Sequence, residues 1–363
     1  MAGRKKKSAG RMPLWLYVLI VVAIALVTYF RTSGEAEAGD PQPPAASAAA
    51  QQTPADETLT VRILDVGQGD SILLACGDET MLIDGGPVEE GQFLVSRLNR
   101  LDVTELTYVI NTHPDEDHCG GLAAVLAKYP AEHVYSSVTE YTTKVFSNVV
   151  KYADEQGHPV EVPQTGDSWT LGSASVQVIG PVQTYSDPNN GSLVLRVDYG
   201  GTSFLFTGDM EQKAEADLMD SGANVRADVL KVGHHGSPTS SSEAFLEAVA
   251  PSIAVISVGK DNDYGHPGAD VLARLEALGA AIYRTDTQGE IIITSDGQTL
   301  TVTTDPTSRE PAAGKDAPFI GNRNSMIVHS ANCAKLPGED NRVYFNTAEE
   351  AEEYGYQKHT CIK

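Results

Sequence analysis

Cysteine, basic side chains and long apolar runs are all scarce in this sequence. The 363 residues include only 4 cysteines, too few for a disulfide scaffold, so any large domain must depend on a buried apolar core. Lys and Arg number 26 against 49 Asp and Glu, which gives a formal net charge of −23. This balance argues against a dense basic surface for phosphate contacts, although it does not exclude a nucleic-acid substrate. Only one long apolar run is present, which excludes a multi-span channel within these residues.

That single apolar run extends from Leu14 to Phe30 and follows a basic tip, residues 1–13. We expect a single-pass transmembrane helix over residues 14–30, with its amino end in the cytoplasm because the positive flank precedes the span. The remainder of the chain would then be extracellular. Ala36-Glu37-Ala38 is a possible signal-peptidase site, so a cleaved, secreted form is the alternative. Residues 31–57, rich in Ala, Pro, Gln and Glu, are predicted to be a disordered linker.

Four potential metal ligands lie within the six residues His113-Pro114-Asp115-Glu116-Asp117-His118. This segment follows the apolar run Leu106–Ile110, a predicted strand, and precedes Leu122–Leu126, the predicted start of a helix. A strand-to-helix loop on a rigid scaffold can aim such ligands at one point. Mixed imidazole and carboxylate ligands suit zinc or manganese, so the segment predicts a hydrolytic centre with two divalent ions. A solvated acidic loop is the alternative for the segment by itself.

Residues of the same ligand types follow three further predicted strands. They are Asp209 after Thr202–Gly208, His234 and His235 after Asp228–Gly233, and His266 beyond Ile253–Val258. Core packing does not explain this recurrence, because a buried His or Asp without a partner costs several kcal/mol. The recurrence therefore favours one site built from several strand ends.

The order of these motifs resembles the metallo-β-lactamase superfamily and, within it, the hydrolase domain of ComEC-type competence proteins. The resemblance rests on seven segments, which are Leu64–Ser71, Leu82–Gly86, His113–Gly121, Asn189–Ser192, Phe206–Asp209, Lys231–Ser237 and Tyr264–Pro267. It covers residues 58–304 and implies an α/β fold, the four-layer αββα metallo-β-lactamase sandwich.

The resemblance also implies roles for individual side chains. The metal ligands would be His113, Asp115, Asp117, His118, Asp209 and His235, with Asp209 as the bridging carboxylate. Asp84 would orient a ligating histidine, and Asp65, Asn190 and Ser192 would lie beside the ligands. Asp115 and the Asn189–Ser192 segment stand where most or many family members have histidines. Oxygen in place of imidazole suits a harder ion such as manganese, so zinc and manganese both stay open.

The activity implied by the resemblance is that of an extracellular metal-dependent phosphodiesterase, and in particular of a nuclease. Asp117 or Asp209 would orient the attacking water, and His234 or His266 would donate a proton or hydrogen bond to a phosphate oxygen. The expected partners are DNA or another phosphodiester and, through the N-terminal helix, the membrane; no obligate protein partner is inferred. A cell-wall or phospholipid head-group phosphodiesterase and a catalytically inactive binding protein are the alternatives.

The chain ends in a second predicted unit, residues 318–363, after a linker at 305–317. About 45 residues are too few for a stable unit held by an apolar core alone. Two histidines and two cysteines predict a structural zinc site, namely His329, Cys333, His359 and Cys361.

The second unit, with a predicted helix over Thr347–Tyr354, resembles the small Ada-type metal-binding modules. The match covers its Gly321–Ser325 opening, its His329/Cys333 pair, its Asn341–Phe345 strand and its helix end, Glu349–Tyr356. That family commonly ends in Cys-x-x-Cys, whereas this chain has His359-x-Cys361. A Cys333–Cys361 disulfide is the alternative. The other two cysteines, Cys76 and Cys119, are expected to be small buried residues.

Overall fold

The computed structural model describes residues 57–309 and 317–362. The predicted basic tip, the transmembrane helix and all but the end of the first linker lie outside the described residues. Among the described helices, none is long and apolar enough to cross a membrane.

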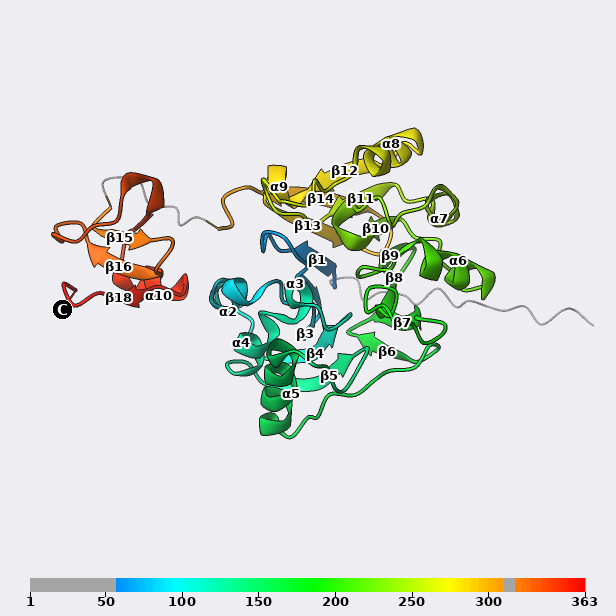
Figure 1. The fold of residues 1–363 in the computed structure, drawn as a ribbon, viewed down its shortest axis with the longest axis horizontal. Helices are drawn as coiled ribbons and strands as arrows, with labels where there is room; N and C mark the ends of the chain where they lie inside the picture. The colour runs from blue at the N-terminus through cyan, green and yellow to red at the C-terminus, as the bar shows by residue number, and fades with distance from the viewer. Residues whose placement is uncertain (1–56, 310–316, 363) are drawn as a thin grey trace, which may run out of the picture. The chain divides into compact units, whose positions relative to one another are not determined.

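Residues 57–309 contain two seven-stranded mixed sheets (Figure 1). The first has the order β14 (Leu300–Asp305), β13 (Glu290–Ser295), β1 (Leu59–Ile63), β2 (Ile72–Cys76), β3 (Glu79–Ile83), β4 (Leu106–Asn111) and β5 (Ala131–Ser136). The second has the order β12 (Ala281–Arg284), β11 (Ile253–Ile256), β10 (Val229–Lys231), β9 (Thr202–Phe206), β8 (Val194–Tyr199), β7 (Ala174–Gly180) and β6 (Ser168–Leu171). The predicted strands that precede the ligand residues are therefore confirmed as β4, β9, β10 and β11.

The two sheets share one apolar core, and helices cover the outer face of each. The shared core takes side chains from both sheets, such as Ile63 and Leu74 from the first and Phe204 and Val255 from the second. The outer face of the first sheet packs against α2 (Gly91–Arg100), α4 (Leu122–Leu126) and α5 (Lys144–Gln156). The outer face of the second packs against α6 (Gln212–Asp220), α7 (Glu243–Val249) and α8 (Ala269–Ala277). The predicted four-layer αββα sandwich is thus the observed architecture.

Parallel pairing within each sheet positions the loops that carry the polar residues. Strand β4 pairs in parallel with β3 and β5, and β10 pairs in parallel with β9 and β11. Parallel neighbours present their carboxyl ends at the same edge, where sites commonly form. Three short helices occupy the loops there: η1 (Val88–Glu90), α3 (Glu116–Cys119) and η2 (Gly233–Gly236). A fourth, α9 (Thr285–Gln288), follows β12.

Residues 317–362 form a small four-stranded sheet with one α-helix. Its strand order is β17 (Arg342–Phe345), β15 (Phe319–Asn322), β16 (Ile327–Ser330) and β18 (Gln357–Lys358), with η3 (Glu339–Asn341) and α10 (Ala348–Glu353) between strands. Helix α10 begins at a capping box in which the Thr347 and Glu350 side chains each bond the other's backbone N–H. Its buried core contains Val328, Val343, Phe345, Ala351 and Tyr356. The strand and helix predicted here are confirmed as β17 and α10.

Candidate metal centre

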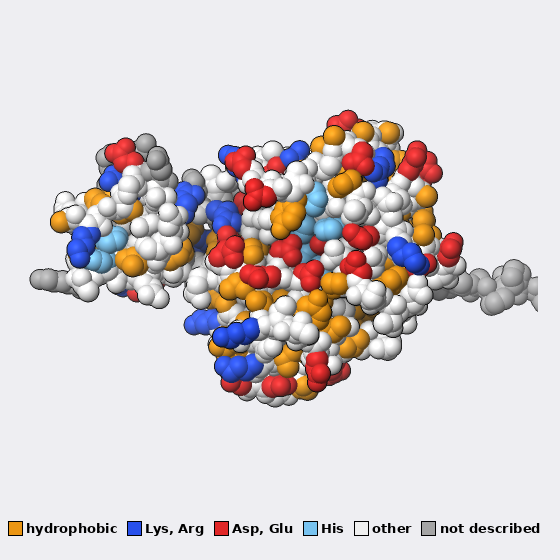
Figure 2. All heavy atoms as spheres, viewed as in Figure 1, with side chains coloured by type: hydrophobic (Ala, Val, Ile, Leu, Met, Phe, Trp, Pro, Cys, Tyr) orange, Lys and Arg blue, Asp and Glu red, His pale blue; other side chains and the backbone are white. Residues whose placement is uncertain are grey.

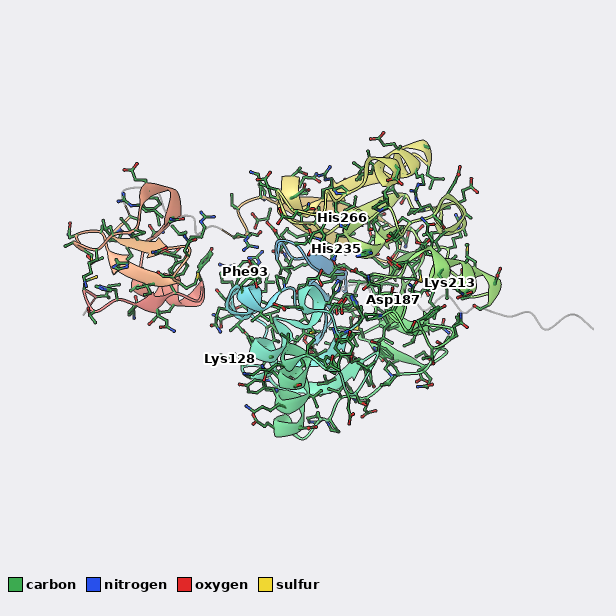
Figure 3. All side chains as sticks on the ribbon, viewed as in Figure 1. Phe93, Lys128, Asp187, Lys213, His235 and His266 are labelled. Atoms are coloured by element: carbon green, nitrogen blue, oxygen red, sulfur yellow. The ribbon has the colours of Figure 1, made fainter. Side chains whose placement is uncertain are left out.

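Loops from both sheets bring four ligand atoms together. His118 Nε2 lies 3.3 Å from His235 Nε2, and Asp209 Oδ1 lies 3.2 Å from His118 Nε2. Asp209 Oδ2 is 3.4 Å and Asp117 Oδ2 is 3.2 Å from His235 Nε2. These four residues form a group that could hold a metal ion. Figure 3 labels His235, and Figure 2 shows histidines on this face with acidic side chains around them.

A second set of atoms adjoins the first and shares Asp209 with it. His113 Nε2 lies 4.0 Å from Asp209 Oδ2 and 3.8 Å from Asp115 Oδ2. The Asp209 carboxylate is therefore near His113 as well as near His118 and His235. Of the six residues to which the resemblance assigned ligand roles, the structure thus gathers Asp117, His118, Asp209 and His235 into one group, with His113 and Asp115 beside it.

The arrangement fits a bound divalent ion in spacing and in unsatisfied polar atoms. Two atoms that each lie about 2.0–2.2 Å from one tetrahedral ion are roughly 3.3–3.6 Å apart. The distances around His235 Nε2, 3.2 to 3.4 Å, are close to this spacing. In addition, His113 Nε2 and Asp209 Oδ1 are buried without a hydrogen-bond partner among the described residues. Such atoms are costly in a folded protein unless something binds them.

The far side of each imidazole ring is held by an oxygen atom. His118 Nδ1 bonds Asp84 Oδ2 at 2.8 Å, and His235 Nδ1 lies 3.1 Å from the Ser257 carbonyl oxygen. His113 Nδ1 lies 3.2 Å from Thr112 Oγ1 and 3.3 Å from Ser192 Oγ. With Nδ1 engaged, each ring presents Nε2 to the centre, which is the arrangement usual for ligating histidines. Asp84 and Ser192 thus lie where the resemblance placed them.

Backbone geometry at two loops allows the close approach. Gly208 has φ 51°, and a Cβ there would lie 2.9 Å from the Ser192 Cβ and 3.0 Å from the Thr112 Cβ, so only glycine fits before Asp209. His234 and His235 also have positive φ, 50° and 54°, which is uncommon for residues other than glycine. Backbone strain of this kind clusters at functional sites.

Burial disfavours the charged form of each side chain in the cluster, whereas neighbouring opposite charges favour it. Burial lowers the pKa of His113 to about 4, and the nearby His118 adds to this effect. Burial also disfavours charge on His118, but the Asp209 and Asp84 carboxylates outweigh it and raise the pKa of His118 well above its usual value. Likewise, His118 and His235 overcome burial and hold the pKa of Asp209 well below its usual value. The carboxylates thus attract positive charge, which a divalent ion also supplies.

Asp70, rather than Asp65, reaches the ligands from the loop after β1. Asp65 was expected beside them, but its carboxylate accepts from the Gly67 N–H at 3.2 Å and lies 3.8 Å from Arg309 Nη1. The turn through Gly67 and Gly69, with φ 72° and 144°, carries the chain inward, so that Asp70 is buried. Asp70 Oδ1 lies 3.4 Å from His235 Nδ1, and Asp70 Oδ2 lies 2.9 Å from Lys231 Nζ.

Sequence reasoning missed this buried pair. A detectable signal was the lone Lys231 inside the apolar run Val229–Val232, because a buried ammonium requires a partner. Asn190, also expected beside the ligands, instead bonds Glu211 Oε2 at 3.2 Å and the Ala214 N–H at 3.3 Å. It anchors the loop before β8 to α6.

His234 and His266 border the cluster without belonging to it. His234 Nε2 lies 3.7 Å from Asp209 Oδ2, and its Nδ1 lies 3.3 Å from Thr239 Oγ1 and 3.5 Å from Glu211 Oε1. The His234 and His266 rings meet edge to face, with centroids 5.7 Å apart. Both rings can therefore face a molecule bound at the ligand cluster.

Residues 317–362 contain a different ligand group. His329, Cys333, His359 and Cys361 place one ligand atom each within 4.8 Å of one another, so they could hold a metal ion. His329 Nδ1 lies 3.4 Å and His359 Nδ1 3.8 Å from Cys333 Sγ. All four cysteines of the chain are free, and Cys76 and Cys119 are buried as expected.

The fold and the ligand cluster together define a metal-dependent hydrolase, and the chain belongs to the metallo-beta-lactamase superfamily. The model of that superfamily matches residues 64–260. This range includes every ligand of the centre described above.

Within the superfamily, the chain is similar to ComEC-type competence proteins. It is 33% identical over 250 residues to ComE operon protein 3 of Bacillus subtilis, covering 64% of this chain and 32% of that protein. It is 35% identical over 239 residues to competence protein ComA of Neisseria gonorrhoeae, covering 65% and 32%. It is 33% identical over 242 residues to recombination protein 2 of Haemophilus influenzae, covering 64% and 28%. The chain thus spans about a third of the length of these relatives.

Proposed function

We propose that this protein is a nuclease that hydrolyses phosphodiester bonds of DNA with two divalent ions, zinc or manganese. The observation that carries the proposal is Asp209, whose Oδ1 lies 3.2 Å from His118 Nε2 and whose Oδ2 lies 3.4 Å from His235 Nε2 and 4.0 Å from His113 Nε2. A carboxylate shared between two ligand sets is typical of two-metal phosphodiester hydrolysis. The relatives named for competence and recombination favour DNA over other phosphodiesters.

The residues divide into ligands and groups that face the substrate. Asp117, His118, Asp209 and His235 would hold one ion, and His113, Asp115 and Asp209 the other. Ions held there would supply an activated water and neutralise charge on the phosphate. His234, held at Nδ1 by Thr239 and Glu211, keeps Nε2 for a hydrogen bond to a phosphate oxygen. His266, beside the His234 ring, can assist the leaving oxygen.

The test is hydrolysis by the purified full-length chain after loading with zinc or with manganese. Single-stranded DNA, duplex DNA, bis-p-nitrophenyl phosphate and a glycerophosphodiester such as teichoic acid serve as substrates. We expect cleavage of DNA and of the nitrophenyl ester, with about two metal ions per sandwich. Hydrolysis of the glycerophosphodiester without cleavage of DNA would show that the protein is a cell-wall or phospholipid head-group phosphodiesterase and not a nuclease. A metal-loaded protein inactive on all substrates would favour a binding role.

We further propose that residues 14–30 anchor the protein with the sandwich on the outer side of the cell membrane. The basic residues before Leu14 support this orientation. Protease added to intact cells should then digest the sandwich. Protection in intact cells, with digestion only after lysis, would contradict it, and release into the medium would indicate the cleaved, secreted form.

A further inference from the structure

A groove of 510 Å³ begins beside the ligand loop and leads away from it. Pro114, between His113 and Asp115, lines its near end. Gly191 and Leu193 also line it, on either side of Ser192, whose Oγ lies 3.3 Å from His113 Nδ1. The groove thus adjoins the loops that carry His113, Asp115 and Ser192, and its volume is in the range of small-molecule binding sites.

The groove has almost no charge. Asp187, labelled in Figure 3, is the only charged residue that lines it, and none of its lining residues is Lys or Arg. A phosphate group in this groove would meet a carboxylate and find no cation to neutralise it. Positive charge for a phosphate would come from the ions at the ligand cluster instead. The part of a substrate that enters the groove must therefore be uncharged.

The surface of the groove suits a flat ring. The Tyr141 side chain is 37% exposed, and its ring is supported edge to face by buried Phe146, with centroids 6.4 Å apart and an interplanar angle of 84°. Val162 is 38% exposed, and Pro163 lies beside it in the lining. Exposed Gln164 adds an amide that can pair with polar ring atoms. An aromatic face, apolar neighbours and an amide are the features that bind a nucleobase without strong sequence preference.

We propose that this groove binds an unpaired nucleobase of the DNA strand whose phosphate lies at the metal centre, with Tyr141 as the stacking surface. The inference rests on the proposed nuclease function and adds a preference to it. A base in a duplex is already stacked and paired, so it must leave the helix before it can enter the groove. Single-stranded DNA is therefore the preferred substrate, and an acidic protein binds it through ions and stacking rather than through basic side chains.

The test compares two single-stranded oligonucleotides with the same sugar-phosphate chain, one with bases and one with abasic tetrahydrofuran residues throughout. The metal-loaded full-length protein should have a kcat/KM about tenfold or more higher on the base-bearing strand, since one base–aromatic stack is worth a factor of that order. In Tyr141→Ala this ratio should fall toward one, mainly through KM. Tyr141→Phe, which keeps the ring, should retain the ratio. The matched control is Tyr152→Ala on α5, outside the groove, which should retain it too.

Two results would overturn the inference, and they differ from each other. If the unmodified protein and Tyr141→Ala prefer the base-bearing strand equally, the groove does not bind the base, although the nuclease proposal still holds. Absence of cleavage of both strands, with the nitrophenyl ester still hydrolysed, would overturn the nuclease proposal and this inference with it. Circular dichroism of each variant shows whether a loss reflects unfolding, and Tyr141→Leu, which keeps apolar bulk without the ring, should behave like Tyr141→Ala.

Discussion

The metal centre of the sandwich and the His/Cys cluster of residues 317–362 differ in ligand chemistry and in surroundings. In the sandwich, buried His118, Asp209 and His235 and partly buried Asp117 come from loops after β4, β9 and β10, far apart in the chain. In the small unit, two histidines and two cysteines lie within one short segment, and three of the four are only partly buried. The rings of His113, His118 and His235 are also held by an oxygen behind each ring, such as Asp84 on His118.

In the sandwich the fold holds the ligands in place, whereas in the small unit we expect the bound metal to stabilise the fold. The sandwich has three extensive apolar clusters that do not involve the ligands. The small unit has one cluster of five buried residues. A small unit with so little core commonly obtains its folding free energy from its metal, whereas a large domain folds around its site. Four predictions follow this contrast, in order of decreasing expected effect.

Metal removal should unfold the small unit but leave the sandwich folded. We expect chelation to unfold residues 317–362, because binding of a structural zinc ion is worth about 10 kcal/mol or more in small units. The sandwich should lose activity but keep its fold. Hydrogen exchange of each region after chelation, together with zinc content, measures both effects.

Cys361→Ser provides the matched variant for the first prediction. It should bind one zinc ion fewer and leave the sandwich active. If Cys333 and Cys361 were instead joined by a disulfide, the unit would resist chelator and unfold with reductant, and two thiols would fail to react under denaturing conditions. That thiol count would end the zinc proposal.

Asp209→Asn should reduce phosphodiester hydrolysis by about a thousandfold, equivalent to about 4 kcal/mol of barrier. The amide keeps the size of the side chain but removes the charge shared by both ligand sets. Bound metal should fall in parallel, and circular dichroism should change little. The control is Asp154→Asn, an exposed carboxylate on α5. An active Asp209→Asn protein with full metal content would remove Asp209 from the centre.

Lys231→Met should destabilise the sandwich by about 3–5 kcal/mol, because Asp70 would keep a buried charge without its partner. Adding Asp70→Asn should recover part of that loss. The exposed pair Lys151 and Glu155, 3.7 Å apart, offers the matched control, and Lys151→Met should change stability by less than about 1 kcal/mol. Urea unfolding followed by fluorescence measures all three. Equal losses of stability for the two lysine variants would mean that the buried pair contributes no more to stability than the exposed pair.

Thr347→Ala should cost about 1 kcal/mol, since it removes the capping box of α10. Thr143→Ala removes the N-cap of α5 in the sandwich and should cost a similar amount. The same loss should lower the melting temperature of the small unit more, because its unfolding entropy is smaller. Calorimetry of the zinc-loaded protein compares the two transitions, and equal shifts would argue that both regions melt together.

Local sequence pattern was enough to predict the elements that carry the ligands. Short apolar runs identified β4, β9, β10 and β11, because strands buried on both faces are short and mostly apolar. The motif around His113 and His118 also indicated a metal site, since clustered imidazoles and carboxylates have few other uses. The acceptor role of Asp84 came from the family resemblance, and the structure places its carboxylate on His118.

Only the tertiary structure decided which residues complete the site. Asp70 contacts Lys231 across the two sheets, and nothing in either local segment specifies that partner. Asp65 and Asp70 lie five residues apart, yet the turn at Gly67 and Gly69 alone determines which carboxylate is buried. The groove beside Tyr141 likewise exists because loops from both sheets meet there. Ligand type is a property of the residue and can be read along the chain, whereas pairing, burial and cavity shape depend on which distant segments pack together.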